Sequence, residues 1–367
     1  MSDLLAPSII EAWFTGPCDL VCYTFPMKSY NLCILGFGNI GRALAELLLE
    51  KTTELREYDI EWHLTGVATR RLGWIADPQG LDVAELLSGE LSASSTRSTL
   101  HNVYEWLDAA QVDVLFELTS LNVQTGQPAI EHIRAALERG AYAVTANKGP
   151  LVHAYQELTT LALAHNTSFM FDATVMAGAP IFSLFHENLP LATLLRFRGL
   201  LNSTANIIIA EMEQGRSFDA AVRKAQELGL AETDPSADVD GWDATVKICA
   251  ISTVLMNVPL KPEQVQREGI RDLSIARIQE ARASGKPFKL VARVERIATG
   301  VFACVRPEQL EATDPLASVG PASLLAHFEM DVLPGLTTTL HVPTSGTAGP
   351  RIVAYDVLAD FLRACKK

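Results

Sequence analysis

The sequence predicts an α/β protein with a Rossmann-type parallel sheet in its first half and a second, α+β domain behind it. Short apolar runs alternate with helical patterns over the first half of the chain, as expected for a parallel sheet. From about residue 195 the pattern changes to polar and acidic motifs. With 367 residues, the chain exceeds one average domain and fits two.

The composition restricts the classes of function. Hydrophobic residues make up 48% of the chain and charged residues 20%, as in a globular protein with a large core. The net charge of −13 argues against a nucleic-acid partner, because such proteins need a basic surface. No run of about 18 apolar residues is present, so we expect no membrane partner. The six cysteines are scattered rather than spaced for a metal site, and we expect reduced thiols in a cytoplasmic protein.

The first 26 residues differ from those that follow. They hold neither the basic segment nor the small-residue cleavage site of a secretory signal. Met27 stands directly before the first strong strand pattern. We therefore expect residues 1–26 to be a loose or disordered N-terminal extension.

A glycine-rich turn follows the first predicted strand, Asn31–Leu35, and a helical pattern follows the turn. This context favours a dinucleotide site. Gly36 permits the tight turn, Gly38 lets a pyrophosphate approach the backbone, and Gly41 lets helix and strand pack closely. The phosphates would lie at the helix N-terminus, where free N–H groups favour anions. The alternative is a turn without a ligand. The expected cofactor contacts are Gly36, Gly38, Asn39, Ile40 and Gly41.

The next predicted strand, Ile60–Ala68, bears on the choice of cofactor. Glu61 lies about 20 residues past the glycine motif, where a ribose ligand is expected, but it is at the wrong end of the strand. Arg70 and Arg71 lie at the correct end, and arginine there suits the 2′-phosphate of NADP. NAD remains possible, because the two arginines would also fit a solvated turn.

Three more strands are expected in the parallel sheet, with a helix over Pro128–Arg139 between the first two. Loops at their carboxyl ends, 118–120 and 145–148, would face the nicotinamide crevice. The predicted strands are Val112–Glu117, Ala141–Thr145 and Phe171–Val175.

An acidic stretch, Ala231–Lys247, runs from a loop into a helix of mostly apolar residues. Asp243 and Lys247 are four residues apart and therefore share one helix face. A lysine among apolar neighbours loses solvation, which lowers its pKa unless an anion offsets the effect. A lowered pKa suits a lysine to proton transfer near neutral pH. The alternative is an ordinary surface pair that contributes about 0.2–0.5 kcal/mol.

Behind the nucleotide fold, two motifs resemble those of homoserine dehydrogenase. The first contains Gly199, Asn202, Thr204, Asn206 and Ile208, and the second is the stretch from Ala231 to Lys247. The loops 146–148 and 267–270 are also similar, and the resemblance runs from about Met27 to the C-terminus. It implies reversible, NADP-dependent hydride transfer between L-homoserine and L-aspartate 4-semialdehyde, in threonine, methionine and isoleucine biosynthesis.

The resemblance also implies roles for individual residues. Lys247 matches the family's proton-transferring lysine, and Asp238 matches a further acidic residue of the catalytic centre. Glu232 and Asp243 match the carboxylates that hold the substrate's ammonium group. Lys148 matches the lysine that touches both nucleotide and substrate.

Two further sites follow from the resemblance. Thr119 matches a nucleotide contact. A monovalent-cation site, expected to hold sodium, would be formed by the backbone carbonyls of Asp172, Val175, Ala177 and Ala179. Asp172 stands where the family commonly has Glu.

The C-terminal region departs from the family pattern. The family's G-A-G turn is Thr347-Ala348-Gly349 here, and Gly349 is expected to contact the cofactor. A last helix is expected over Ala354–Ala364. We expect neither the family's regulatory domain nor its fused kinase, and no feedback by threonine.

The expected organisation is therefore an NADP-binding domain at 27–156, completed by segment 341–367, and a substrate-binding and dimerisation domain at 157–340. The family implies a homodimer formed through the second domain's sheet. Two alternatives remain. One is another NAD(P)-dependent amino-acid dehydrogenase of the same fold. The other is a catalytically silent NADP-binding sensor, which would lack Lys148 or Lys247, and this chain has both.

Overall fold

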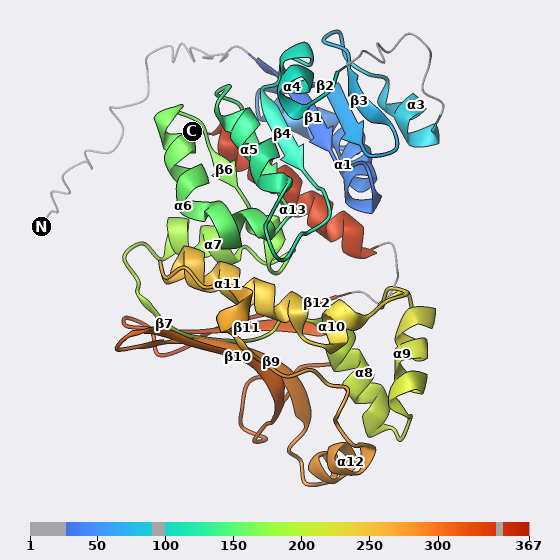
Figure 1. Ribbon diagram of the computed structural model, residues 1–367, viewed down its shortest axis with the longest axis vertical. Coiled ribbons are helices and arrows are strands. Elements are labelled where there is room, and N and C mark those ends of the chain that lie inside the picture. The colour runs from blue at the N-terminus through green and yellow to red at the C-terminus, as the bar shows by residue number, and fades with distance from the viewer. Residues whose placement is uncertain (1–26, 90–99, 343–347, 367) are drawn as a thin grey trace, which may run out of the picture.

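The computed structural model describes residues 27–89, 100–342 and 348–366. These residues form two bodies, each built around a six-stranded sheet, and α11 (Trp242–Leu255) lies between them (Figure 1). This confirms the predicted α/β architecture with a second sheet domain. The expected extension at 1–26 lies outside the described residues.

The first sheet has the strand order β3-β2-β1-β4-β5-β6. All neighbouring strands are parallel except β2 and β3, which form an antiparallel hairpin. The bounds are β1 (Lys28–Leu35), β2 (Ile60–Thr69), β3 (Gly73–Ala76), β4 (Val114–Glu117), β5 (Tyr142–Thr145) and β6 (Phe169–Met170). Four of the predicted strands are thus confirmed as β1, β2, β4 and β5, and β3 was not predicted.

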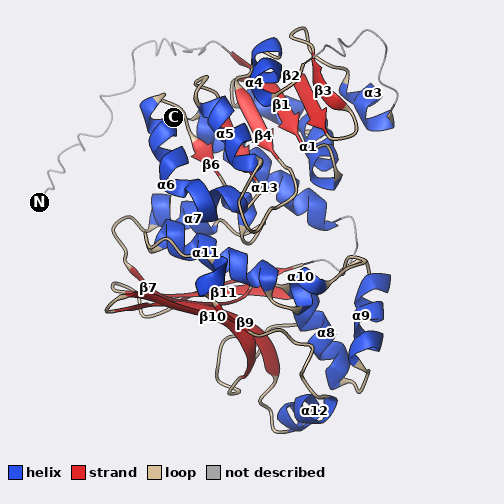
Figure 2. Ribbon diagram, in the orientation of Figure 1, coloured by secondary structure: helices blue, strands red, loops and turns tan. Residues whose placement is uncertain are grey.

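Helices cover both faces of this sheet (Figure 2). Side chains alternate along β1, so that Leu32 and Ile34 pack with one set of helices, while Cys33 and Leu35 pack with the other. The first set contains α1 (Asn39–Glu50), α2 (Thr52–Glu57), α3 (Val83–Ser88) and α13 (Ala348–Cys365). The second contains α4 (Val103–Ala109), α5 (Ala129–Leu137) and α6 (Gly149–Ala164).

The prediction of a strand over Phe171–Val175 is wrong. The edge strand β6 ends at Met170, and the chain then forms a 3-10 turn, η1 (Asp172–Thr174). The backbone N–H and the hydroxyl of Thr174 both donate to the carbonyl of Phe171, at 3.1 and 2.7 Å. The N–H of Asp172 donates to Asp360 at 2.8 Å. These bonds turn the chain away from the sheet, although its apolar residues fit a strand pattern.

Two boundaries also need correction. The domain boundary expected after residue 156 falls inside α6, and β6 still belongs to the first sheet. The helix α6 leads directly into β6, and β6 pairs with β5. The first body therefore continues at least through Met170. The last helix, α13, begins at Ala348 rather than Ala354, and it packs against α1 and β5 of the first body.

The second sheet has the order β12-β11-β7-β9-β10-β8 and is antiparallel except for β8, which pairs in parallel with β10. Its strands are β7 (Leu194–Leu200), β8 (Gln266–Arg267), β9 (Phe288–Ile297), β10 (Gly300–Gln309), β11 (Ser323–Met330) and β12 (Leu336–His341).

The remaining elements connect the bodies or cover the second sheet. Short turns α7 (Ile181–Ser183), η2 (Leu184–Asn188) and η3 (Pro262–Gln264) lie in the connections. The helices are α8 (Ser203–Glu213), α9 (Phe218–Glu227), α10 (Ser236–Val239), α11 and α12 (Ile275–Ala283). Most of α11 is buried because it packs on α6 of the first body and on β9 and β10 of the second. Among the helices of the described residues, none is long and apolar enough to span a membrane.

Candidate active site

The turn between β1 and α1 has the geometry of a phosphate-binding loop. Gly36 has φ of +102°, and a Cβ there would lie 2.5 Å from the carbonyl oxygen of Leu118. A Cβ on Gly41 would collide with the carbonyl oxygen of Gly36. Around Gly38, by contrast, no described atom beyond its neighbours in the chain lies within 4 Å of the Cβ position, and no side chain caps α1. Open space beside free helix N–H groups fits the pyrophosphate of a dinucleotide.

Arg70 and Arg71 occupy the tight turn between β2 and β3, where Thr69 pairs with Gly73. Both arginines are largely exposed. Within the described part of the chain, neither guanidinium has an acidic partner. Two unpaired cations therefore stand beyond the carboxyl end of β2, the end at which a nucleotide ribose lies in this fold.

A buried carboxylate joins the loops that follow β4 and β5. Glu117, the last residue of β4, has no exposed surface. It accepts hydrogen bonds from the N–H of Thr119 at 3.2 Å, from the hydroxyl of Thr119, and from the hydroxyl of Thr145 at 3.0 Å. Asn147 Nδ2 donates to the carbonyl of Thr119 at 3.2 Å. The two crevice loops are thus fixed to each other, and sequence reasoning missed Glu117 and Asn147. In this structure the Thr119 hydroxyl points to Glu117, and its predicted nucleotide contact stays a prediction.

The central feature of the site is a carboxylate shared by two lysines. Asp243, in the first turn of α11, has Oδ1 at 3.5 Å from Lys148 Nζ and Oδ2 at 2.7 Å from Lys247 Nζ. Lys247 Nζ also donates to the carbonyl of Leu201 at 2.7 Å. The three charged side chains are only 13–20% exposed. Because Lys148 lies directly before α6 of the first body, this is not an isolated pair on a helix surface.

Burial and charge act against each other in this cluster. Burial lowers the pKa of Lys148, and the carboxylate of Asp243 opposes that shift. Burial by itself would raise the pKa of Asp243, but the charges of Lys247 and Lys148 outweigh it and hold that pKa well below its usual range. The cluster therefore carries an ionised carboxylate beside two amines, one of which burial pushes towards its neutral form.

Asp238 joins the cluster through an uncharged residue. Asn202 Nδ2 donates to Asp238 Oδ1 at 2.6 Å and to Asp243 Oδ2 at 3.1 Å. Burial raises the pKa of Asp238, and the hydrogen bond from Asn202 opposes that shift. Sequence reasoning noted Asn202 only as part of a motif, and its position directly before a helix was the available signal.

The structure does not bring Glu232 into this cluster. Glu232 is exposed on the bend after α9, and no side-chain partner for it is found among the described residues. Its backbone carbonyl accepts a hydrogen bond from Gln226 at 3.0 Å. Its predicted contact with a substrate ammonium group stays a prediction.

The segment proposed to bind a cation is tied to α13. The Asp172 carboxylate accepts hydrogen bonds from the N–H of Phe182 at 2.9 Å and from Arg363 at 2.7 Å. The Gly178 N–H donates to Asp356 at 2.6 Å. The Ala179 carbonyl already accepts a bond from the N–H of Ile181, at 2.8 Å. In the described ranges, no group of three or more His, Cys, Asp and Glu side chains is arranged to hold a metal ion, and the carbonyl cation site stays a prediction.

Gly349 lies within the first turn of α13 rather than before the helix. Apart from its chain neighbours and the backbone of its own helix, no described atom lies within 4 Å of its Cβ position. Thr347, the first residue of the turn, lies outside the described residues. The cofactor contact of Gly349 therefore stays a prediction.

Comparison with known proteins identifies the same two regions. A family model described as homoserine dehydrogenase matches residues 180–362, and a model of the homoserine dehydrogenase NAD binding domain matches residues 36–172. A protein of Pseudomonas canavaninivorans, named NAD(+)-dependent homoserine dehydrogenase, is 33% identical over 343 residues, which is 92% of this chain and 96% of the relative.

Two solved structures share the fold. A putative homoserine dehydrogenase from Archaeoglobus fulgidus has a TM-score of 0.79 and 30% identity, over 92% of this chain and 99% of that chain. A mutant of a hyperthermophilic archaeal homoserine dehydrogenase, in complex with NADPH, has a TM-score of 0.74 and 28% identity, over 92% of this chain and 98% of that chain.

Proposed function

The chain belongs to the homoserine dehydrogenase family of NAD(P)-dependent oxidoreductases acting on a CH–OH group, and from this premise we propose the reaction that it catalyses. The reaction is reversible hydride transfer between L-homoserine and L-aspartate 4-semialdehyde, with NADP as the preferred cofactor. It would serve the biosynthesis of threonine, methionine and isoleucine. The observation that carries the proposal is the Asp243 carboxylate held between Lys148 and Lys247.

The preference for NADP rests on Arg70 and Arg71. Their guanidinium groups lack acidic partners among the described residues and belong to the turn beyond the carboxyl end of β2, which supports a 2′-phosphate contact there. The relatives do not decide the matter, since one is named for NAD(+) and another is solved with NADPH.

In the reducing direction, negative charge develops on the aldehyde oxygen of the substrate as it becomes an alkoxide. Bound nicotinamide nucleotide supplies the hydride. Lys247 donates its proton to that oxygen, and Lys148 adds positive charge beside it. In the oxidising direction, Lys247 accepts the proton of the homoserine hydroxyl.

The substrate's ammonium group is held by carboxylates. Lys148, Lys247, Asp238 and Asp243 are formally neutral together when all four are ionised. Asp243 and Glu232 are the carboxylates proposed to bind the substrate ammonium group, and Glu232, which is exposed and outside the cluster, would approach it when substrate binds. Holding this group fixes the reacting carbon against the nicotinamide.

A direct assay tests the function. L-homoserine is incubated with NADP or with NAD at alkaline pH, and the absorbance of the reduced nicotinamide is followed. L-aspartate in place of homoserine tests the rival amino-acid dehydrogenase. We expect reduction with homoserine, faster with NADP, and none with aspartate. Nucleotide binding without reduction by any substrate would instead indicate a silent sensor.

The cation and oligomer proposals extend this function. Backbone carbonyls of Asp172, Val175, Ala177 and Ala179 are donors of the kind that bind a monovalent cation, and we assign sodium to them. The test is the thermal midpoint in sodium chloride against choline chloride at equal ionic strength. A midpoint that is equal in the two salts would contradict the assignment.

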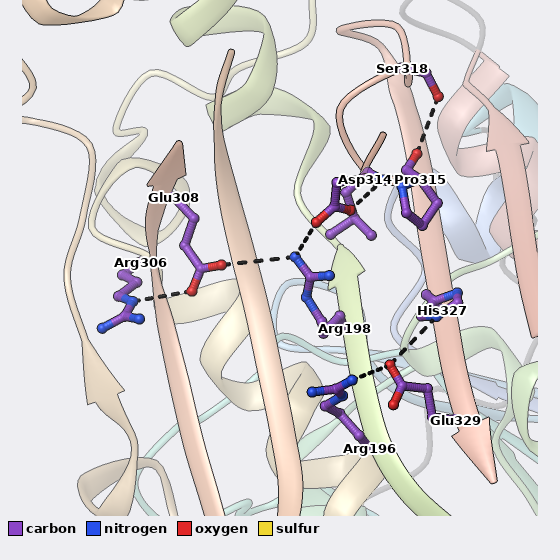
Figure 3. Close-up of polar contacts among 10 residues, drawn as sticks. Arg196, Arg198, Arg306, Glu308, Asp314, Pro315, Ser318, His327 and Glu329 are labelled. Atoms are coloured by element: carbon purple, nitrogen blue, oxygen red, sulfur yellow. Dashed lines mark hydrogen bonds and ion pairs between the residues drawn. The ribbon is translucent and has the colours of Figure 1, made fainter. Parts of the chain in front are cut away.

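The proposed homodimer uses the face of the second sheet turned away from α11. Phe197 of β7 packs towards α11, so its neighbours Arg196 and Arg198 lie on the opposite face. Figure 3 shows their partners: Arg196 contacts Glu329 at 2.6 Å and Arg198 contacts Asp314 at 2.8 Å. Because these charges are paired within the chain, a second copy can cover them at lower desolvation cost. Light scattering after size exclusion should give twice the mass of the chain, and a monomer mass would contradict the proposal.

For the domain division, we propose a nucleotide-binding part that begins at Met27 and is completed by α13, and a substrate-binding part that contains the second sheet. The packing of α13 on α1 and β5 supports this division.

A further inference from the structure

We propose that Asn202 is the positioning residue of the active site: its side-chain amide sets the two carboxylates, Asp238 and Asp243, in place. The inference rests on the proposed function, which it deepens, because it assigns a role to an uncharged residue outside the acidic stretch.

The orientation of the Asn202 amide is fixed by its surroundings. Asn202 follows β7 and caps α8, where its Oδ1 accepts a hydrogen bond from the N–H of Ala205 at 2.8 Å. Its backbone carbonyl accepts one from Asn206 Nδ2 at 3.1 Å. The side chain is only 5% exposed. Since Oδ1 is held by the helix, the NH₂ group must point the other way, towards the carboxylates.

The NH₂ group has two hydrogens, and both are used. Nδ2 lies 2.6 Å from Asp238 Oδ1 and 3.1 Å from Asp243 Oδ2. The same Asp243 oxygen lies 2.7 Å from Lys247 Nζ. A neutral double donor between two carboxylates offsets their mutual repulsion and favours the ionised form of each. Without it, the two carboxylates would move apart or one would take up a proton.

The backbone directly before Asn202 holds Lys247, the third charged residue of this contact. The carbonyl of Leu201 accepts a hydrogen bond from Lys247 Nζ at 2.7 Å. Leu201 and Asn202 together therefore contact three of the proposed catalytic and substrate-binding side chains. The junction between β7 and α8 acts as one rigid element, because the helix cap fixes its conformation.

This arrangement accounts for the motif that contains Asn202. A Cβ on Gly199 would lie 2.9 Å from the carbonyl oxygen of Leu325, so β7 approaches β11 too closely for a larger residue. The Thr204 hydroxyl donates to the carbonyl of Leu230 at 2.7 Å, which ties the segment before Glu232 to α8. Each polar member of the motif thus fixes part of the substrate site.

The groups that face Asp238 determine its pKa and, through it, the pH dependence of activity. They are Asp243 and Lys247 of α11, Lys148 before α6, and Asn202 and Thr204 at the start of α8. Removing the hydrogen bond from Asn202 takes a stabilising contact from the charged form of Asp238. The pKa of Asp238 then rises, and activity that needs this carboxylate ionised appears only at higher pH.

The variant N202S tests this role. Serine caps helices about as well as asparagine, so α8 keeps its cap, but the double donor is lost. We expect kcat/KM to fall about 10- to 100-fold, in the range of a lost hydrogen bond to a charged group. The acid limb of the pH profile should move to higher pH. N202D, which also caps the helix, adds a third negative charge and should move it further.

The matched control is N102S. Asn102 caps α4 through its Oδ1, which accepts a bond from the N–H of Glu105 at 3.0 Å, and it belongs to the first body, outside the Asp238–Asp243 cluster. N102S should leave kcat/KM and the pH profile unchanged. Thermal midpoints of all three variants show whether each one folds.

A second readout needs no turnover. The pKa of Asp238 is followed by carboxyl carbon NMR of aspartate-labelled protein, with D238N for assignment. A wild type that never oxidises homoserine would defeat the proposed function, while the NMR titration would still test Asn202. Folded N202S and N202D with an unchanged pKa of Asp238 and an unchanged acid limb would overturn the inference.

Discussion

Lys148 and Lys247 share Asp243, with Nζ to oxygen distances of 3.5 Å and 2.7 Å, and they come from different elements of the molecule. Lys148 follows a strand of the first sheet, whereas Asp243 and Lys247 lie on the helix between the sheets. The carboxylate therefore joins the first body to α11 at the point where chemistry is proposed.

The first prediction concerns the pH dependence of stability. The pKa of aspartate in an unfolded chain is about 3.9. Lys247 and Lys148 hold the pKa of Asp243 below that value in the folded chain. The stabilisation is thus full above about pH 4 and is lost as the pH falls below it towards the folded pKa. In D243N, the free energy of unfolding from urea titrations should fall less steeply below pH 4 than in the wild type. The control is D219N, at an exposed position on α9. Equal slopes in wild type and D243N would contradict the account.

The second prediction separates two glycines of one turn. In G36A, the new methyl group would meet the Leu118 carbonyl in a backbone with positive φ, so we expect destabilisation by more than about 1 kcal/mol. In G38A, the methyl group enters open space, and the thermal midpoint should stay near the wild-type value. The methyl group would instead occupy the place of the pyrophosphate, so the affinity for nucleotide, measured by fluorescence titration, should fall. G38A with wild-type affinity would argue against this turn as the phosphate site.

The third prediction concerns cofactor choice. R70S and R71S each remove a cation from the turn where a 2′-phosphate would lie. A hydrogen bond to a charged group contributes about 1.5–3 kcal/mol, so the KM for NADP should rise about 10- to 100-fold in at least one variant. The KM for NAD should change little. R56S removes the same charge from an exposed site on α2 and serves as the control. An equal rise in the KM for NADP and for NAD would show that the arginines do not bind the 2′-phosphate.

The strands that could be predicted from the sequence are short apolar runs with clear ends. β1, β2, β4 and β5 are such runs, and their pattern is local. The strand expected at Phe171–Val175 failed because its conformation depends on Asp360 and Arg363, which are almost 200 residues away in the chain. No local pattern contains that contact.

The site was predictable to a similar degree. The spacing of Asp243 and Lys247 places them on one helix face, and the resemblance named Lys148 as a companion. Two polar residues were missed, Glu117 and Asn147, and Asn202 was noted only as a member of a motif. Glu117 ends an otherwise apolar strand, and a charge at that position was a usable signal of a buried network.

The most direct test of the central claim is K247M, which removes the charge of Lys247 and keeps much of its side-chain volume. Turnover of homoserine and binding of NADPH, the latter by fluorescence, are measured on the same preparation. K224M, on the surface of α9, is the matched control. We predict that kcat falls about 10²- to 10⁴-fold in K247M while NADPH affinity stays close to that of the wild type. A K247M enzyme that binds NADPH normally and turns over homoserine at the wild-type rate would contradict the account.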